Sequence, residues 1–180
     1  MLKNKQSFYI VFPTPLGNAA VIYTDKPFLI VNVLLPQKHK KELVKTIEKN
    51  WLAKAGAHPV ALKIAEIIKE FFNGTAIKPP WEWMDMAGLT PLQQLALRAT
   101  VDIPYGSVRS YKQIAEAINR PRAYRFVGST LAKNPFPILI PCHRVIRSDS
   151  SLGQFGGGTD LKKNLIDLEA QFASKKMMKS

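Results

Sequence analysis

The sequence predicts an α+β protein, in which a small N-terminal β-sheet with helices is followed by a mostly helical C-terminal part. Three observations support this class. Residues 7–35 are rich in β-branched and aromatic side chains interrupted by turn residues. Residues 59–72 carry apolar side chains at helical spacing, and helix-starting signals recur after residue 89. The 180 residues, 46% of them hydrophobic, are enough to bury a core.

The N-terminal part is expected to begin with the sheet and to continue with two helices. Three strands are predicted, at residues 7–12, 19–23 and 28–33. Residues 38–50 have the pattern of a charged helix. Residues 59–72 give a clearer helix, in which Pro59 suits the first turn and Gly74 suits the end.

Residues 73–89 contain several prolines and glycines and are typical of a linker. We place the domain boundary near residue 84, which gives an N-terminal domain of residues 1–84 and a C-terminal domain of residues 85–180. Trp81 and Trp83 lie in this segment. We expect them to pin the linker to the surface; a stacking platform for a base is the alternative.

The second half is predicted to be mostly helical. Thr90 is a suitable N-cap with Pro91 at the first helical position, and Ser110 caps a short helix that follows it. Another helix is expected over residues 122–132. These two short helices, joined by a tight turn, match a helix-turn-helix. A last helix is expected over residues 161–173, with Leu161, Leu165, Leu168 and Phe172 on its buried stripe.

The chain is strongly basic, with 26 Lys and Arg against 13 Asp and Glu, a net charge of +13. Between Arg98 and Arg147, nine basic residues stand against two acidic ones. A polyanionic partner explains this concentration; a solvated basic surface is the alternative. No apolar run is long enough to cross a bilayer, and no signal-peptide core follows the basic start. We therefore expect a soluble cytoplasmic protein, associated with the nucleoid in a prokaryote.

The only cysteine, Cys142, is the most informative residue. A lone thiol forms no intrachain disulfide and builds no cysteine zinc site, which leaves a buried bystander or a nucleophile. His143 and Arg144 follow it directly, and we expect their positive charge to favour the reactive thiolate. Three prolines in residues 134–141 stiffen the approach to the sulfur and argue against a central strand.

A nucleophilic thiol needs a base, and the base needs an orienting group. His143 and Glu169, the latter at the edge of the last helix's apolar stripe, are the candidates, although a solvated Glu169 is the simpler alternative. Residues 153–158 form a glycine-rich loop without the lysine of a phosphate-binding loop. Its backbone would approach a flat ligand closely, with Phe155 over one face; a flexible hairpin is the alternative.

Taken together, these motifs resemble the O6-alkylguanine-DNA alkyltransferases. The resemblance rests on the segment Pro141-Cys142-His143-Arg144-Val145, preceded by Asn134-Pro135 and Ile138-Leu139-Ile140. It runs in register from about Pro104 to Glu169, through Pro104-Tyr105-Gly106, Ser110-Tyr111, Arg125-Phe126-Val127-Gly128 and the glycine loop. Residues 1–84 fit the family only in outline, as its α/β, ribonuclease-H-like domain. The family likewise implies a winged-helix-like setting for the helix-turn-helix.

The resemblance implies DNA repair in which a damaged guanine is flipped out of the duplex. Cys142 then takes the alkyl group from O6 irreversibly, once per molecule. In this scheme His143 deprotonates the thiol through a water, Glu169 orients His143, and Tyr111 meets the charge on the leaving guanine. Asn134 ties the end of the recognition helix to the turn that carries Cys142.

The resemblance also implies a DNA interface in which the recognition helix enters the minor groove and Arg125 fills the gap left by the flipped base. The residues implied to contact DNA are Arg125, Tyr111, Lys112, Ala123, Gly128, Ser129 and Arg122. Those implied to line the base pocket are Tyr111, Val145, Phe155, Gly156 and Gly157. The implied partner is double-stranded DNA containing O6-alkylguanine, bound by a monomer; O4-alkylthymine as a second substrate and cooperative assembly on DNA stay open.

No cofactor is implied. Some relatives hold zinc through N-terminal Cys and His residues, but this chain has only His39 and His58 there, so we predict no metal. The main alternative function is a non-catalytic relative that binds alkylation damage, against which the presence of Cys142 argues. A thiol hydrolase would not explain the basic helix-turn-helix, and a transcriptional regulator would leave the Pro-Cys-His turn without a purpose.

Overall fold

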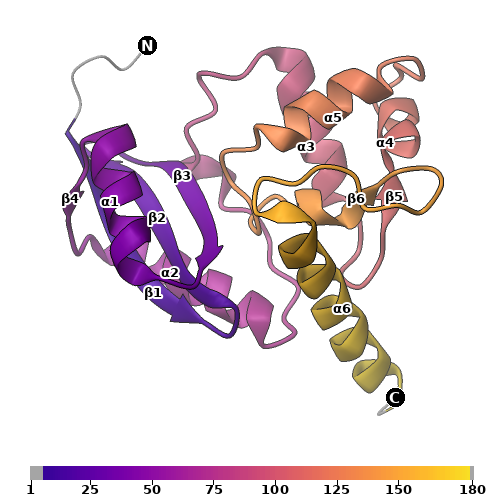
Figure 1. The fold of residues 1–180 in the computed structure, drawn as a ribbon. Helices are drawn as coiled ribbons and strands as arrows, with labels where there is room; N and C mark the ends of the chain where they lie inside the picture. Colours follow the sequence, from indigo (N-terminus) through magenta and orange to yellow (C-terminus); the bar gives the residue numbers. More distant parts are fainter. Residues whose placement is uncertain (1–5, 179–180) are drawn as a thin grey trace. The chain divides into compact units, whose positions relative to one another are not determined.

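The computed structural model describes residues 6–178, which divide into two compact units (Figure 1). The first unit runs to Asn73 and also includes Pro80–Gly88; the second comprises Gly74–Pro79 and the chain from Leu89 onward. The first contains the larger sheet and the second is mostly helical, so the α+β class is confirmed. Within residues 6–178, no helix has the length and apolar character needed to cross a membrane.

A four-stranded sheet in the order β3-β2-β1-β4 forms the first unit's centre. Its strands are β1 (Ser7–Thr14), β2 (Gly17–Asp25), β3 (Phe28–Gln37) and the short β4 (Lys54–Ala55). The first three pair as antiparallel neighbours, and β4 pairs in parallel with β1. The three predicted strands are present but longer than expected, because turn-forming residues such as Pro13 and Asn18 still pair with each other across β1 and β2.

Helices cover both faces of this sheet (Figure 1). Side chains alternate between the faces of a strand, so the paired residues Tyr9 and Ile22 point together toward α1 (Lys40–Trp51). There they pack with Leu43 and Ile47. Helix α2 (Pro59–Phe72) has the predicted bounds and contacts the same two strands. Its buried residues are Ala61, Ile64, Ala65, Ile68, Phe71 and Phe72.

The segment Pro80–Gly88 continues the first unit. It contains the 3-10 turn η1 (Trp81–Trp83), after which Met84 forms a β-bridge with Ile30 of β3. The Trp83 ring meets Phe28 edge-on at 6.4 Å between centroids, and the ammonium of Lys63 lies 5.5 Å from the Trp83 centroid. These contacts fix the segment to β3 and α2, as expected of residues that pin a linker.

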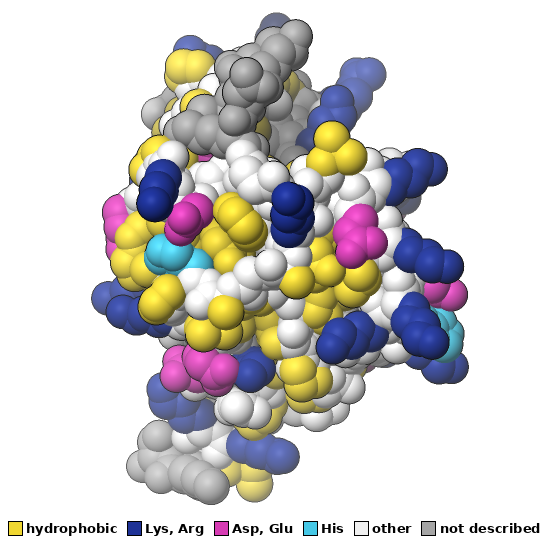
Figure 2. Space-filling view, turned by 90° about the vertical axis from the view of Figure 1, so that its left-hand side faces the viewer, with side chains coloured by type: hydrophobic (Ala, Val, Ile, Leu, Met, Phe, Trp, Pro, Cys, Tyr) yellow, Lys and Arg dark blue, Asp and Glu magenta, His cyan; other side chains and the backbone are white. Residues whose placement is uncertain are grey.

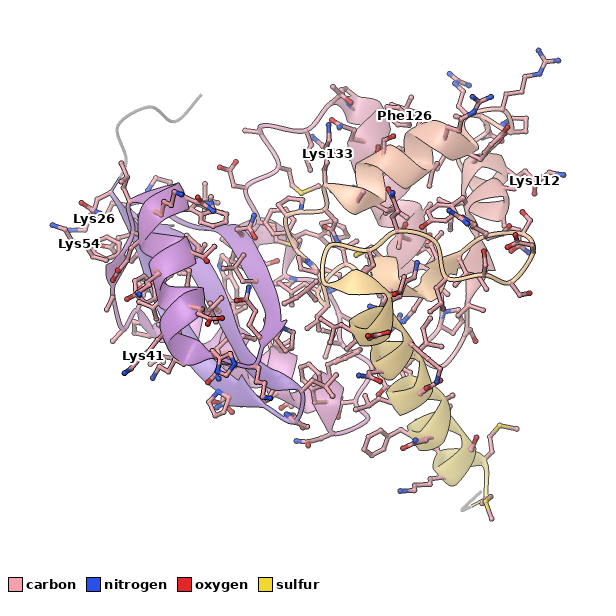
Figure 3. The ribbon with its side chains drawn as sticks, viewed as in Figure 1. Lys26, Lys41, Lys54, Lys112, Phe126 and Lys133 are labelled. Atoms are coloured by element: carbon pink, nitrogen blue, oxygen red, sulfur yellow. The ribbon has the colours of Figure 1, made fainter. Side chains whose placement is uncertain are left out.

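The positive charge is divided unequally between the units. The first carries 11 Lys against 7 Asp and Glu, and the second 15 Lys and Arg, including all 7 arginines, against 6 Asp and Glu. On the face drawn in Figure 2, lysines are spread among other side chains, and Lys26, Lys41 and Lys54 project to solvent from different places (Figure 3). The basic excess therefore belongs mainly to the second unit.

The second unit consists of helices joined by a small parallel sheet. Its elements are α3 (Pro91–Val101), β5 (Arg109–Ser110), α4 (Tyr111–Ala117), α5 (Tyr124–Ala132), η2 (Cys142–Arg144), β6 (Val145–Ile146) and α6 (Gly158–Met177). The predicted caps are confirmed, since the hydroxyls of Thr90 and Ser110 accept hydrogen bonds from the backbone N–H of Gln93 and Gln113. Strands β5 and β6 bring Arg109 beside Val145, which joins the start of α4 to the segment after Cys142.

Helices α4 and α5 pack against each other as the predicted helix-turn-helix. Helix α5 begins at Tyr124, later than predicted, because Ala123 is still in a turn in which its N–H donates to Arg120 O at 2.8 Å.

The buried stripe predicted for the last helix is wrong except for Leu165. The buried positions of α6 are Lys162, Leu165 and Glu169, whereas Leu161, Leu168 and Phe172 are half-buried. A hydrophobicity pattern misses this face because two of its three buried residues are charged.

Candidate active site and nucleic-acid interface

Cys142 opens the turn η2 and is only 5% exposed. The preceding residues 134–141 contain no strand, in agreement with the prediction from their three prolines. Backbone hydrogen bonds close this segment instead, from Ile140 N to Phe136 O and from Cys142 N to Ile140 O, each at 2.8 Å. The sulfur is therefore positioned by a stiff, hydrogen-bonded backbone.

Asn134 connects the end of α5 to this backbone. Its Nδ2 donates to Ile140 O at 3.0 Å and to Cys142 Sγ at 3.2 Å, while its Oδ1 accepts from Phe136 N at 3.0 Å. Both ends of the amide are used, which fixes its orientation. Burial raises the pKa of the Cys142 thiol, and the hydrogen bond from Asn134 offsets part of this rise, because it stabilises the thiolate.

Glu169 is the centre of a buried polar network. Its side chain is 1% exposed, and its Oε1 lies 2.7 Å from His143 Nε2. Arg144 Nε donates to both carboxylate oxygens at 3.0 Å, and the backbone N–H of Gly106 donates to Oε2 at 2.8 Å. The guanidinium of Arg144 donates further to Ile103 O at 2.7 Å. The carboxylate thus has enough donors to stay charged without water.

The protonation states in this network follow from burial and from these partners. Burial raises the pKa of Glu169, but the hydrogen bonds and charges of His143 and Arg144 outweigh it, and the pKa is lowered overall. Burial lowers the pKa of His143 despite the neighbouring carboxylate. Glu169 is therefore ionised and the imidazole neutral near pH 7, with the proton on the Nε2 that faces Glu169.

Lys162 is a further charged residue in the interior. It is fully buried, and its ammonium donates to the carbonyls of Val145 and Leu152. The same nitrogen lies 5.7 Å from the centroid of Tyr111 and 6.0 Å from that of Phe155. Burial lowers the pKa of Lys162 to about 8, and its charge lowers the pKa of the Cys142 thiol. Lys162 ties the strand after Cys142 to the glycine-rich loop.

This arrangement corrects one expectation. We expected His143 and Arg144 to supply positive charge to the sulfur, but the imidazole is neutral and Arg144 is bound to Glu169. The cation that acts on the thiol is Lys162. Neither the carboxylate-binding role of Arg144 nor the presence of Lys162 was foreseen from the sequence. The only signal for Lys162 in the sequence is its helical spacing from an apolar residue, since it stands four positions before Ile166 in the last helix.

A cavity of about 780 Å³ lies between α4, α5 and the loop after β6. The residues that line it are Tyr111, Lys112, Tyr124, Arg125, Gly128, Ser129, Ala132, Lys133, Arg147, Ser148, Gly153 and Gln154. The first seven lie on α4 and α5, and Lys112 and Lys133 are labelled in Figure 3. Gly128 faces Tyr111, since a Cβ on Gly128 would lie 3.8 Å from the tyrosine ring, at ordinary van der Waals contact.

The cavity contains five of the seven residues predicted to contact DNA: Tyr111, Lys112, Arg125, Gly128 and Ser129. The other two precede it in the chain, Arg122 in the exposed turn before α5 and Ala123 at its N-cap. Cys142 is a described residue that does not line this cavity. The same is true of four predicted pocket residues, Val145, Phe155, Gly156 and Gly157. Phe155 is near Lys162, while Gly156 and Gly157 are exposed at the start of α6.

Metal-binding residues are not gathered anywhere in residues 6–178: no group of three or more His, Cys, Asp or Glu side chains is placed to hold an ion.

Comparison with known proteins identifies the family. Residues 91–171 match the family model described as 6-O-methylguanine DNA methyltransferase, DNA binding domain. A methylated-DNA–protein-cysteine methyltransferase of Methanosarcina barkeri is 49% identical over 80 residues, which span 44% of this chain and 51% of that relative. The constitutive methylated-DNA–protein-cysteine methyltransferase of Bacillus subtilis is 33% identical over 170 residues, 91% of this chain and 95% of that one. The chain belongs to the methylated-DNA–protein-cysteine methyltransferase family.

Solved methyltransferase structures extend the likeness to the fold. The crystal structure of Mycobacterium tuberculosis OGT in complex with DNA has a TM-score of 0.69 and 27% identity, and the match covers 92% of this chain and 94% of that chain. The match includes the first unit, for which the sequence offered only an outline. The resemblance drawn from the Pro-Cys-His segment is confirmed.

Proposed function

We propose that this methyltransferase repairs DNA by moving the alkyl group of O6-alkylguanine onto Cys142. The observation that carries the proposal is the environment of the sulfur. The thiol accepts a hydrogen bond from Asn134 and feels the charge of Lys162, and its neighbour His143 is held by the buried carboxylate of Glu169. A bystander cysteine in an apolar core has no need of these groups.

The reaction is a direct displacement. The thiol proton passes through a water to His143, which is neutral and carries its other proton on Nε2. The sulfur of Cys142 then forms a bond to the alkyl carbon as the bond from that carbon to O6 breaks, and the electron pair of the broken bond stays on the guanine. The hydroxyl of Tyr111 donates to the guanine and meets this charge. The guanine anion takes up one proton, and His143 gives up the one that it received from the thiol, so the products are unmodified guanine and a thioether with no net change in protons.

The thioether implies a single turnover. A carbon–sulfur bond of this kind is stable, and the reaction leaves no thiol on Cys142 to attack a second lesion. The protein is therefore consumed stoichiometrically, without a cofactor.

The DNA-binding surface is proposed to be the cavity face of α4 and α5. Lys112, Arg125 and Lys133 of the cavity, with Arg122 in the turn before α5, supply a positive charge suited to phosphates. The small residues Gly128 and Ser129 of α5, with Ala123 at its N-cap, let the helix backbone approach a minor groove, and Arg125 takes the place of the flipped base. The M. tuberculosis relative in complex with DNA supports DNA as the partner.

The finer assignments belong to the same proposal. Double-stranded DNA with O6-alkylguanine is the partner, a monomer binds it, and the base pocket is completed by Val145, Phe155, Gly156 and Gly157 once the base enters. Residues 1–84 form the ribonuclease-H-like domain of this proposal, and residues 85–180 form the DNA-binding and alkyl-transfer domain. The cytoplasm, next to the chromosome, is the compartment in which such a protein acts.

The test is the mass of the protein after mixing with an oligonucleotide that contains O6-methylguanine. We expect one methyl group per protein, on the peptide that contains Cys142, with the reaction ending at equimolar amounts. Cys142→Ala should transfer nothing and still bind the DNA. Methyl transfer by Cys142→Ala would overturn the nucleophile assignment. Damage binding by the wild-type protein without any transfer would favour the non-catalytic damage-binding alternative.

A second variant tests base flipping. Arg125→Ala should slow repair of duplex DNA far more than reaction with the free modified base, because the free base needs no extrusion from a stack. Equal losses on the two substrates would remove the role of Arg125 in flipping.

A further inference from the structure

Tyr124 is exposed in a way that core packing does not explain. It is 44% accessible, and every other aromatic side chain in residues 6–178 is buried or half-buried. A large aromatic ring left in water contributes little through the hydrophobic effect. The ring therefore either has no function or meets a ligand.

The position of Tyr124 indicates a ligand. It is the first residue of α5 and lines the 780 Å³ cavity together with Arg125 and Tyr111. Gly128, four residues later on the same face of α5, also lines the cavity and carries no side chain. At this end the cavity is therefore lined by an aromatic ring, an arginine side chain and the backbone of a glycine. This combination is suited to a flat ligand.

The Tyr124 ring also contacts Arg125, the residue that we propose fills the gap left by the flipped base. The guanidinium carbon of Arg125 lies 5.7 Å from the Tyr124 centroid. Successive helical residues point about 100° apart, so this contact requires the Arg125 side chain to fold back over the ring. The two side chains therefore form a unit, held together by the attraction of a cation for an aromatic face.

We propose that Tyr124 is a base-stacking residue, whose ring covers a nucleobase left without its neighbour or partner when the damaged nucleotide is extruded. The inference rests on the proposed function and deepens it, because it names an unstacked base within the duplex as a second ligand of α5. Stacking of this kind tolerates any sequence, since every base has a π-face. It also stabilises the opened duplex, which a flipped nucleotide requires.

The experiment uses a duplex with one unpaired 2-aminopurine, whose fluorescence falls when an aromatic ring stacks on it. The full chain with Cys142→Ala should quench the probe, and adding Tyr124→Phe should preserve the quenching because the ring remains. Adding Tyr124→Ala should abolish it and weaken binding to this duplex by roughly 5- to 150-fold, the range for stacking on a single base. Binding to a fully paired duplex should weaken far less, because no base there is left unstacked.

Leu95→Ala is the matched control, because Leu95 is 45% exposed on α3 and is not a cavity residue. It should behave as the parent on both duplexes. Equal weakening by Tyr124→Ala on paired and unpaired DNA, or Tyr124→Phe as weak as Tyr124→Ala, would overturn the stacking role; the second result would indicate a hydroxyl contact instead. Quenching needs no methyl transfer. A wild-type protein that quenches the probe but accepts no methyl group would therefore overturn the proposed function and leave Tyr124 as assigned.

Discussion

Replacing Glu169 with glutamine should destabilise the second unit more than any exposed substitution on the same helix. The carboxylate is 1% exposed and accepts from His143, Arg144 and Gly106, over sequence separations of 25 to 63 residues. Glutamine has nearly the same size and creates no cavity. It carries no charge, however, and presents two N–H donors to a site already filled with donors.

The expected loss follows from the charge left behind. Removing one partner of a buried ion pair typically costs about 3–5 kcal/mol, because the other charge stays buried without compensation. Here that charge is the guanidinium of Arg144, which keeps only neutral acceptors in this network, Ile103 O and the side-chain oxygen of the glutamine. For a chain of this size, each kcal/mol corresponds to a Tm shift of about 2–4 °C, so we expect Tm to fall by about 6–20 °C.

Thermal unfolding followed by far-ultraviolet circular dichroism is the assay, since the second unit is mostly helical. Asp167→Asn is the matched control: it is on α6 two residues earlier, and its ion pair with Lys163 is exposed, so Tm should hardly change. If Glu169→Gln lowers Tm no more than Asp167→Asn, the carboxylate is not the centre of the network and the reasoning fails.

Three further predictions concern the site. Asn134→Ala removes the hydrogen bond to the Cys142 sulfur, so the pH midpoint of iodoacetamide alkylation should rise by about 1–2 units; a midpoint that stays or falls would contradict the bond's role. Lys162→Met removes the buried ammonium that favours the thiolate, so below pH about 8, where Lys162 is protonated, its alkyl transfer from a free O6-alkylguanine base should be slower than that of the wild-type protein, and the two rates should converge above that pH. A ratio of the two rates that does not change with pH would assign the effect to another group. Lys112→Ala should reduce the slope of log binding constant against log salt by about 1 if Lys112 contacts a phosphate, and an unchanged slope would exclude that contact.

Much of the local structure was predictable because it is encoded by neighbouring residues. Thr90 and Ser110 start their helices through bonds to residues three positions along. The prolines around residue 137 exclude a strand, and Pro59 fixes the start of α2. The last helix shows the limit of this approach. Its predicted apolar stripe failed because its inward face carries Lys162 and Glu169, whose partners lie in other elements.

The sequence by itself determined the family and the helix-turn-helix and identified Cys142 as the candidate nucleophile, because each depends on a short run of residues with its own chemistry. Tertiary structure decided how those parts cooperate. It joined Arg144 and His143 to Glu169, brought the ammonium of Lys162 to the carbonyls of Val145 and Leu152, and left Tyr124 open at the cavity. These outcomes depend on burial and on contacts between distant segments, which remove water from charges and fix their partners. A residue's neighbours in the chain carry no information on either.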